Sequence, residues 1–80
     1  MQNEITVRIM DTMAAVFAMP VSDISDISSV DNIASWDSLK HMNLILALEE
    51  EFNITIPDED VGNMTNFKMI ALVVRDNYGK

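Results

Sequence analysis

Ser38 is the residue best placed to take part in chemistry. It lies in the run Asp37-Ser38-Leu39, at the start of an amphipathic segment that extends to Phe52. A serine hydroxyl is a weak nucleophile unless a base held by a third group activates it. The only histidine, His41, follows three residues later and could reach Ser38 on a helix, but no Gly-x-Ser-x-Gly turn surrounds the serine. We therefore expect Ser38 to be modified by another enzyme, and His41 to be a surface residue.

Two helices are predicted on either side of a long connection. Over residues 3–18, apolar side chains recur at steps of three and four and trace one helix face. Pro20 ends this helix near Phe17, because the residue before a proline avoids helical geometry. The second helix begins around Asp37, whose carboxylate suits an N-cap and the positive end of the helix dipole. The residues expected on its core side are Leu39, Met42, Leu46 and Phe52, with Leu44, Ile45 and Leu48 widening the apolar stripe.

The connection itself, residues 20–36, is rich in serine and aspartate. Single apolar residues punctuate it at every third position, namely Val21, Ile24, Ile27, Val30 and Ile33. This spacing is compatible with short helical turns, but we expect a long ordered loop that these residues pin to the core. Loops of this length are usually functional.

The rest of the chain predicts one short turn and a last helix. Residues 58–61 form the turn, which Gly62 ends, and the last helix starts near Thr65 or Asn66, both of which are competent caps. The predicted fold class is therefore all-α: an antiparallel four-helix bundle with three main helices, one short helix and a long loop between helices one and two. Residues 1–80 are expected to form a single domain.

Composition and charge restrict the function. The chain has no cysteine, so a carried thioester would need sulfur from a prosthetic group. The N-terminus lacks a signal-peptide pattern and no membrane span is found, so we expect a cytoplasmic, soluble protein. Residues 21–60 hold ten acidic side chains and one basic side chain, a net charge of −9. This charge disfavours nucleic acid and favours partners with basic surfaces, although a surface whose acids only aid solubility would look the same.

Four features follow one another in the central part of the chain. They are a long acidic loop, Asp37-Ser38-Leu39, an apolar helix that ends in Leu48-Glu49-Glu50-Glu51-Phe52, and Ile56-Pro57-Asp58-Glu59-Asp60. This ordered set resembles the acyl carrier protein family, and the resemblance runs from about Ile5 to Val74. It implies that Ser38 carries a covalent 4′-phosphopantetheine arm from coenzyme A, on which acyl or aminoacyl intermediates are held as thioesters. It also implies a carrier, expected to be a monomer, rather than an enzyme.

The resemblance implies three kinds of partner. A phosphopantetheinyl transferase modifies Ser38, a ligase or transferase loads the acyl or aminoacyl group, and downstream biosynthetic enzymes dock through basic surfaces. A helix N-terminus suits the modification, because its free N–H groups and positive dipole end favour a phosphate. The residues predicted to bind partners are Trp36, Asp37, Leu39, Lys40, Met42, Leu46, Glu49 and Glu50, although Met42 and Leu46 also fit a core position. No metal ligand and no catalytic residue is predicted.

Two neighbours of Ser38 depart from the pattern of fatty-acid carriers. Those carriers resemble Gly-Ala-Asp-Ser-Leu followed by an acid, whereas Trp36 replaces the small residue and Lys40 replaces the acid. The Trp-Asp-Ser-Leu form is similar to carriers of specialised pathways, such as polyketide, aminoacyl or surface-polysaccharide biosynthesis. It predicts weaker docking of enzymes of fatty acid biosynthesis. Trp36 could alternatively pack on the second helix near His41, as a hydrophobic staple.

Two other function classes fit parts of the sequence. The first is a helical protein-interaction module with no prosthetic group, which a mass measurement after incubation with coenzyme A and a transferase would distinguish. The second is a calcium sensor, suggested by the acids of the loop. Residues 23–34 lack the glycine at the sixth position and the acid at the twelfth position of an EF-hand, which argues against this class.

Overall fold

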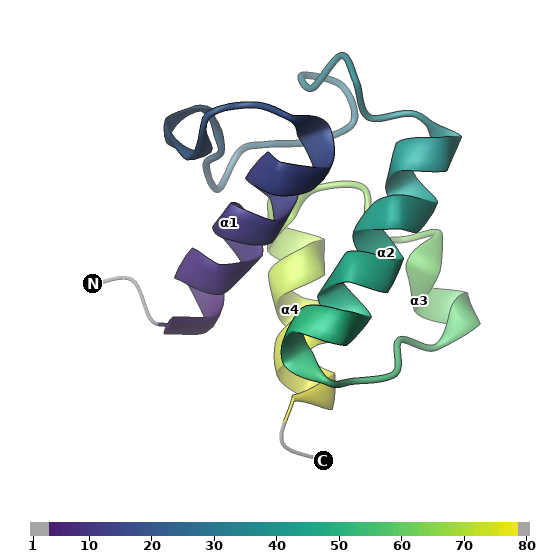
Figure 1. The fold of residues 1–80 in the computed structure, drawn as a ribbon. Helices are drawn as coiled ribbons and strands as arrows, with labels where there is room; N and C mark the ends of the chain where they lie inside the picture. The colour runs from purple at the N-terminus through teal and green to yellow at the C-terminus, as the bar shows by residue number, and fades with distance from the viewer. Residues whose placement is uncertain (1–3, 79–80) are drawn as a thin grey trace.

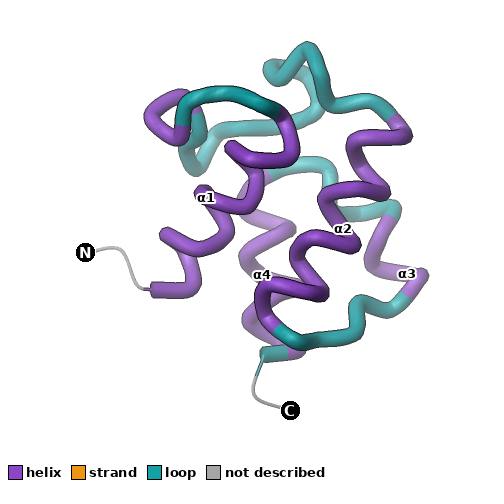
Figure 2. Tube along the Cα trace, in the orientation of Figure 1, coloured by secondary structure: helices purple, strands orange, loops and turns teal. Residues whose placement is uncertain are grey.

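The computed structural model describes residues 4–78, and this part of the chain is helical. Its elements are α1 (Glu4–Phe17), the short 3-10 helix η1 (Val21–Asp23), α2 (Ser38–Phe52), α3 (Asp58–Val61) and α4 (Phe67–Asn77). α1 runs opposite to α2 and α4, and the short α3 lies beside α2 (Figure 1). Figure 2 shows no strand among the described residues. The predicted all-α bundle, with its short third helix and its long first connection, is confirmed.

One hydrophobic core joins the three long helices. α1 contributes Ile9, Met13 and Phe17, which are spaced by four residues and so lie on one face. The side chains buried from α2 are Leu44, Ile45, Leu48 and Phe52, and those from α4 are Phe67, Ile70, Ala71, Val73 and Val74. Ile56 and Met64, on either side of α3, are buried in the same cluster. Burial of one such side chain contributes about 1.5–3 kcal/mol, so this cluster is the main source of stability.

The outer side of α2 corrects one expectation from the sequence. Leu39 and Leu46 are 70% and 60% exposed, and Met42 is exposed as well, although all three were expected to face the core. Residues three and four apart share a helix face, so these three form one stripe and the buried residues of α2 form another. α2 is therefore apolar on two sides, and only one of them meets the core.

The loop between α1 and α2 covers the end of the bundle at which α2 begins (Figure 1). Ile24 and Ile33 are buried and pin the loop to the core, as predicted, whereas Val21, Ile27 and Val30 are exposed. The pinning prediction is thus correct for two of its five residues. The alternative of short helical turns also holds locally, because η1 is one such turn.

Backbone hydrogen bonds join this loop to the start of α4. The N–H of Val30 donates to the carbonyl of Thr65 at 3.0 Å, and the N–H of Phe67 donates to the carbonyl of Ser28 at 2.8 Å. Asn66 caps α4, with its side chain accepting a hydrogen bond from the N–H of Met69 at 2.9 Å, so the predicted helix start is confirmed. The loop and the start of α4 therefore hold one another in place beside Ser38.

α2 ends at Phe52, the last residue of the predicted amphipathic segment, and α3 ends before Gly62. Asn53 follows α2 in the left-handed region, with φ of 53°. Gly62 follows α3, as predicted. No helix within residues 4–78 is long and apolar enough to cross a membrane.

Candidate functional site

Ser38 is the first residue of α2, and its side chain is exposed. Asp37 caps the helix from an extended conformation, with its carboxylate accepting a hydrogen bond from the N–H of Lys40 at 2.8 Å. The predicted helix start and cap are therefore confirmed. The first N–H groups of a helix have no helical carbonyl to bond, so they favour a phosphate at Ser38, whereas the negative charge of the capping Asp37 opposes it.

Trp36 lies in the position of the second alternative from the sequence, packed on α2 near His41. Trp36 is only 7% exposed, and its ring lies 4.9 Å from the ring of Phe17. Its indole N–H donates to Nδ1 of His41 at 3.0 Å. Trp36 thus packs against α2 next to His41, which is the staple arrangement. A contact between Trp36 and a partner stays a prediction, and only a small edge of the ring is open to one.

His41 is not the simple surface residue that the sequence suggests. It is half-buried, and its Nε2 lies 2.7 Å from the carbonyl oxygen of Val61 at the end of α3. Both ring nitrogens therefore have partners other than Ser38. This geometry removes the Ser-His pair that the three-residue spacing allowed, because a general base needs a free nitrogen lone pair directed at the hydroxyl.

A cleft of about 420 Å³ opens beside Ser38. Three parts of the chain form its walls: the loop before α2, the first turns of α2, and the connection between α3 and α4. The lining residues are Val30, Trp36, Asp37, Ser38, His41, Met42, Gly62 and Thr65. Sequence reasoning found Ser38 and its neighbours but missed Val30, Gly62 and Thr65, because only the tertiary structure brings these segments together.

Most of the predicted partner-binding residues share the outer side of α2. Leu39, Met42, Leu46 and Glu50 are exposed, and they follow Ser38 at helical spacing. Asp37 is exposed at the start of the helix and Lys40 is half-buried on its flank. The structure therefore offers one continuous apolar stripe with an acid at its far end.

Glu49 differs from Glu50, although the sequence groups them. Glu49 is half-buried, and its carboxylate accepts a hydrogen bond from the N–H of Ile56 at 2.9 Å. The carbonyl of Glu49 also accepts the N–H of Ile54 at 3.1 Å. Glu49 thus holds the turn between α2 and α3, and its role in partner binding stays a prediction.

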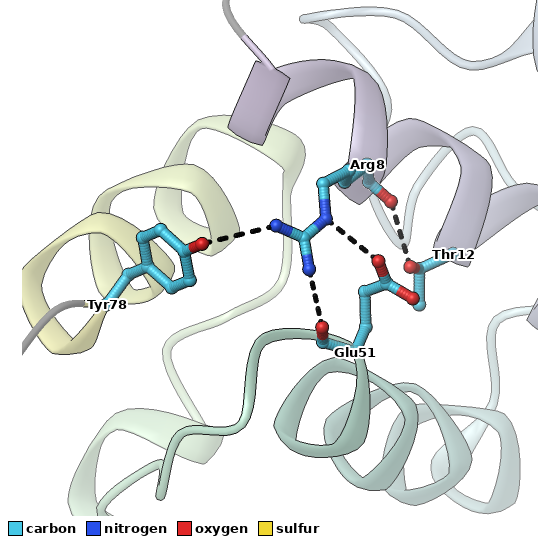
Figure 3. Close-up of polar contacts among 4 residues, drawn as sticks. All are labelled: Arg8, Thr12, Glu51 and Tyr78. Carbon is cyan, nitrogen blue, oxygen red and sulfur yellow. Dashed lines mark hydrogen bonds and ion pairs between the residues drawn. The ribbon is translucent and has the colours of Figure 1, made fainter.

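Glu51, the third acid of this run, binds Arg8 of α1 (Figure 3). Nε of Arg8 lies 2.8 Å from the carboxylate of Glu51, and a second guanidinium nitrogen donates to the Glu51 carbonyl at 2.6 Å. A third donates to the hydroxyl of Tyr78 at 3.3 Å, and the guanidinium lies 4.4 Å above the ring of Phe52. The hydrogen bonds to Glu51 and then to Tyr78 raise the pKa of Arg8. This contact joins α1 to the end of α2, far from Ser38 along the helix.

Comparison with known proteins identifies a family over most of the chain. The model of a family described as "Phosphopantetheine attachment site" matches residues 7–72. The chain belongs to this family. The domains of this family are carriers and not enzymes, and their cofactor is covalent 4′-phosphopantetheine.

Two acyl carrier proteins are similar to this phosphopantetheine attachment domain. The acyl carrier protein of Helicobacter pylori (strain J99) is 46% identical over 41 residues, which cover 51% of this chain and 53% of that protein. The mitochondrial acyl carrier protein 3 of Arabidopsis thaliana is 31% identical over 64 residues, which cover 80% of this chain and 49% of that protein. Each match thus spans about half the length of the relative. The recognition of the acyl carrier protein family is confirmed.

The residues around Ser38 fit the cofactor of this family. The hydroxyl is open to an approaching enzyme, lies at the positive end of a helix and borders a cleft large enough for part of an arm. The group that a phosphopantetheine arm supplies when bound is a thiol, which the cysteine-free chain lacks. No cluster of three metal-ligating side chains occurs among residues 4–78.

Proposed function

We propose that this domain carries acyl or aminoacyl groups as thioesters on a 4′-phosphopantetheine arm attached to Ser38. The observation that carries the proposal is the position of Ser38, exposed at the first residue of α2 behind a capping aspartate. In residues 4–78, the ring nitrogens of His41 bond elsewhere, so Ser38 is not paired with that base. An exposed hydroxyl without an activating base suits a substrate of another enzyme.

The modification uses Ser38 as the acceptor of a phosphoryl group. The Ser38 oxygen forms a bond to the phosphorus that carries the pantetheine part of coenzyme A, and the pyrophosphate bond breaks. Adenosine 3′,5′-bisphosphate leaves, and a base of the transferase takes the hydroxyl proton. The first N–H groups of α2 favour the phosphodiester that results, because they lie at the positive end of the helix dipole.

The outer side of α2 is proposed as the docking surface for partner enzymes. Its apolar stripe of Leu39, Met42 and Leu46 is exposed beside Ser38, and Glu50 lies at its far end. A partner with an apolar strip flanked by basic residues complements this surface, and opposite charges speed the encounter and orient the complex. The partners proposed are a phosphopantetheinyl transferase, a loading ligase or transferase, and downstream biosynthetic enzymes.

We further propose a pathway other than fatty acid synthesis, for a monomeric carrier in the cytoplasm. Lys40 supports this pathway, because it puts a positive charge two residues after Ser38, where a basic partner would be repelled. Trp36 supports it less than the sequence suggested, since the ring is buried against Phe17 and His41.

The experiment is incubation of the protein with coenzyme A and a promiscuous phosphopantetheinyl transferase, followed by measurement of the intact mass. We expect the parent to gain the mass of one phosphopantetheine group. Ser38→Ala should keep the circular dichroism spectrum and melting temperature of the parent and gain nothing, since it removes an exposed hydroxyl. A full gain on the alanine variant would move the attachment site elsewhere. No gain on the parent would favour the interaction module without a prosthetic group.

A further inference from the structure

We propose that His41 is a positioning residue for the modification of Ser38, because one imidazole ring joins the segment before α2 to the end of α3. The inference rests on the proposed function and adds to it a residue that does not touch the reacting atoms. His41 lies in the wall of the cleft that Ser38 borders. Its two ring nitrogens contact two different segments, the one before α2 through Trp36 and the end of α3 through Val61.

The two hydrogen bonds require one form of the ring. The indole N–H of Trp36 can only donate, so Nδ1 of His41, at 3.0 Å, must be an acceptor without a proton. The proton of a neutral imidazole then lies on Nε2, which donates to the carbonyl of Val61 at 2.7 Å. Neutral His41 therefore satisfies both partners at once, and its orientation is determined by them.

The bond to Trp36 holds the segment that leads into Ser38. Trp36 precedes Ser38 by two residues, and Asp37 between them caps the helix. The Trp36 ring is further held by the ring of Phe17, with 4.9 Å between the ring centroids, and the backbone N–H of Trp36 donates to the carbonyl of Ile33 at 3.1 Å. These contacts restrain the conformation of the backbone that leads from Trp36 into α2. The position of Ser38 relative to the outer side of α2 is then restrained as well.

The bond to Val61 holds α3 at the other wall of the cleft. α3 has four residues, and its N-cap, Pro57, makes no capping hydrogen bond through its side chain. A helix so short depends on tertiary contacts, because a single turn is not stable alone. Gly62, the next residue, lines the cleft. His41 thus holds both walls of the cleft, one through each nitrogen.

Substitution of His41 by asparagine or by glutamine separates its bond to Trp36 from its bond to Val61. The amide of asparagine lies near the place of Nδ1, so His41→Asn can accept from Trp36 but cannot reach Val61. The amide of glutamine lies near the place of Nε2, so His41→Gln can donate to Val61 but cannot accept from Trp36. Trp36→Phe removes the indole N–H and keeps an aromatic ring against Phe17. Each histidine variant therefore removes one defined bond, and Trp36→Phe removes the same bond as His41→Gln together with part of a buried ring.

The test measures kcat and KM for modification by a phosphopantetheinyl transferase, with each protein as the substrate. We expect kcat to fall about fivefold for His41→Gln and Trp36→Phe, the equivalent of one hydrogen bond, while KM stays unchanged because the outer side of α2 is intact. His41→Asn should keep the parent kcat but show faster amide exchange in α3. The double variant Trp36→Phe with His41→Gln should lose no more than either single one, since both remove the same bond.

Two controls separate this role from a general loss of stability. Ile70→Val removes one methylene from a fully buried site on α4, and it should lower the melting temperature without changing kcat. The indole N–H resonance of Trp36, the only tryptophan, should shift in His41→Gln and stay in place in His41→Asn. Equal kcat in the parent, His41→Gln and Trp36→Phe would overturn the inference, as would an equal fall in Ile70→Val. Failure of the parent to be modified at all would instead overturn the proposed function.

Discussion

The carboxylate of Glu49 accepts a hydrogen bond from the N–H of Ile56 at 2.9 Å, which joins the last turns of α2 to the segment that precedes α3. Ile56 is buried in the core, so its N–H has little access to water. Folding removes the water molecules that would bond this N–H, and the Glu49 carboxylate replaces them as its acceptor. Glu49 therefore stabilises the turn after α2, whereas the neighbouring Glu50 is exposed and accessible to a partner.

Removal of the Glu49 carboxylate should destabilise the fold. We expect Glu49→Ala to lower the free energy of unfolding by about 1–3 kcal/mol, because the N–H of Ile56 then lacks an acceptor. Glu49→Gln keeps an acceptor oxygen in place, so its free energy of unfolding should fall much less. Urea unfolding followed by circular dichroism measures both variants. If the two were equally unstable, the carboxylate charge would matter more than the hydrogen bond.

Reversal of the charge at Glu50 should instead slow partner enzymes. Glu50 is exposed on the outer side of α2, so Glu50→Lys should reduce the rate of modification of Ser38 several-fold at low ionic strength and leave the melting temperature unchanged. Added salt should slow the parent as well, because it screens the attraction. Asp76→Lys, an exposed reversal on α4, is the matched control and should be modified at the parent rate. A salt-independent rate in the parent would argue against electrostatic docking.

Divalent cations should stabilise the domain without a dedicated site. Residues 21–60 have a net charge of −9, and their mutual repulsion opposes the compact state. The ion pair of Glu51 with Arg8 brings one cation from α1 into this region, in addition to Lys40, but a partly exposed pair contributes little. Millimolar magnesium should therefore raise the melting temperature. A gain of about 1 kcal/mol corresponds to about 4–8 °C for a domain of this size. A flat or falling melting temperature would contradict the prediction.

Lys40 should reduce the use of this carrier by fatty-acid enzymes. We expect Lys40→Glu to be loaded faster than the parent by a fatty-acid malonyl transferase, because the substitution replaces repulsion from a basic partner by attraction. Lys68→Glu, at an exposed site of α4, introduces the same change of charge elsewhere and should have little effect. Trp36 is better left intact, since its ring is buried. Equal loading of the parent and Lys40→Glu would remove the main support for a specialised pathway.

The local signals of the sequence were sufficient to locate the helices and to place Ser38 at the start of one of them. Asp37 and Asn66 are caps because their short side chains can accept from an N–H two or three residues on, and this capacity is visible in the residue type. Pro20 and Gly62 follow helices because their backbone preferences disfavour continuation. Recognition of the family depended on the same kind of information, namely residue types in a fixed order around Ser38.

The side of α2 that meets the core was decided only by the tertiary structure. Leu39, Met42 and Leu46 are as apolar as Leu44 and Leu48, so periodicity alone gives two equivalent stripes. The packing of α1 and α4 chooses one of them, and the other is left exposed next to Ser38.

The contacts that surround the site are long-range and have no local signature. His41 bonds Val61 twenty residues away, Glu51 bonds Arg8 across 43 residues, and Val30 approaches Ser38 only because the loop is bonded to the start of α4. Residue type shows that these side chains can bond, but not with which partner. The partner is set by where packing of the core brings each helix, and this depends on the whole chain at once.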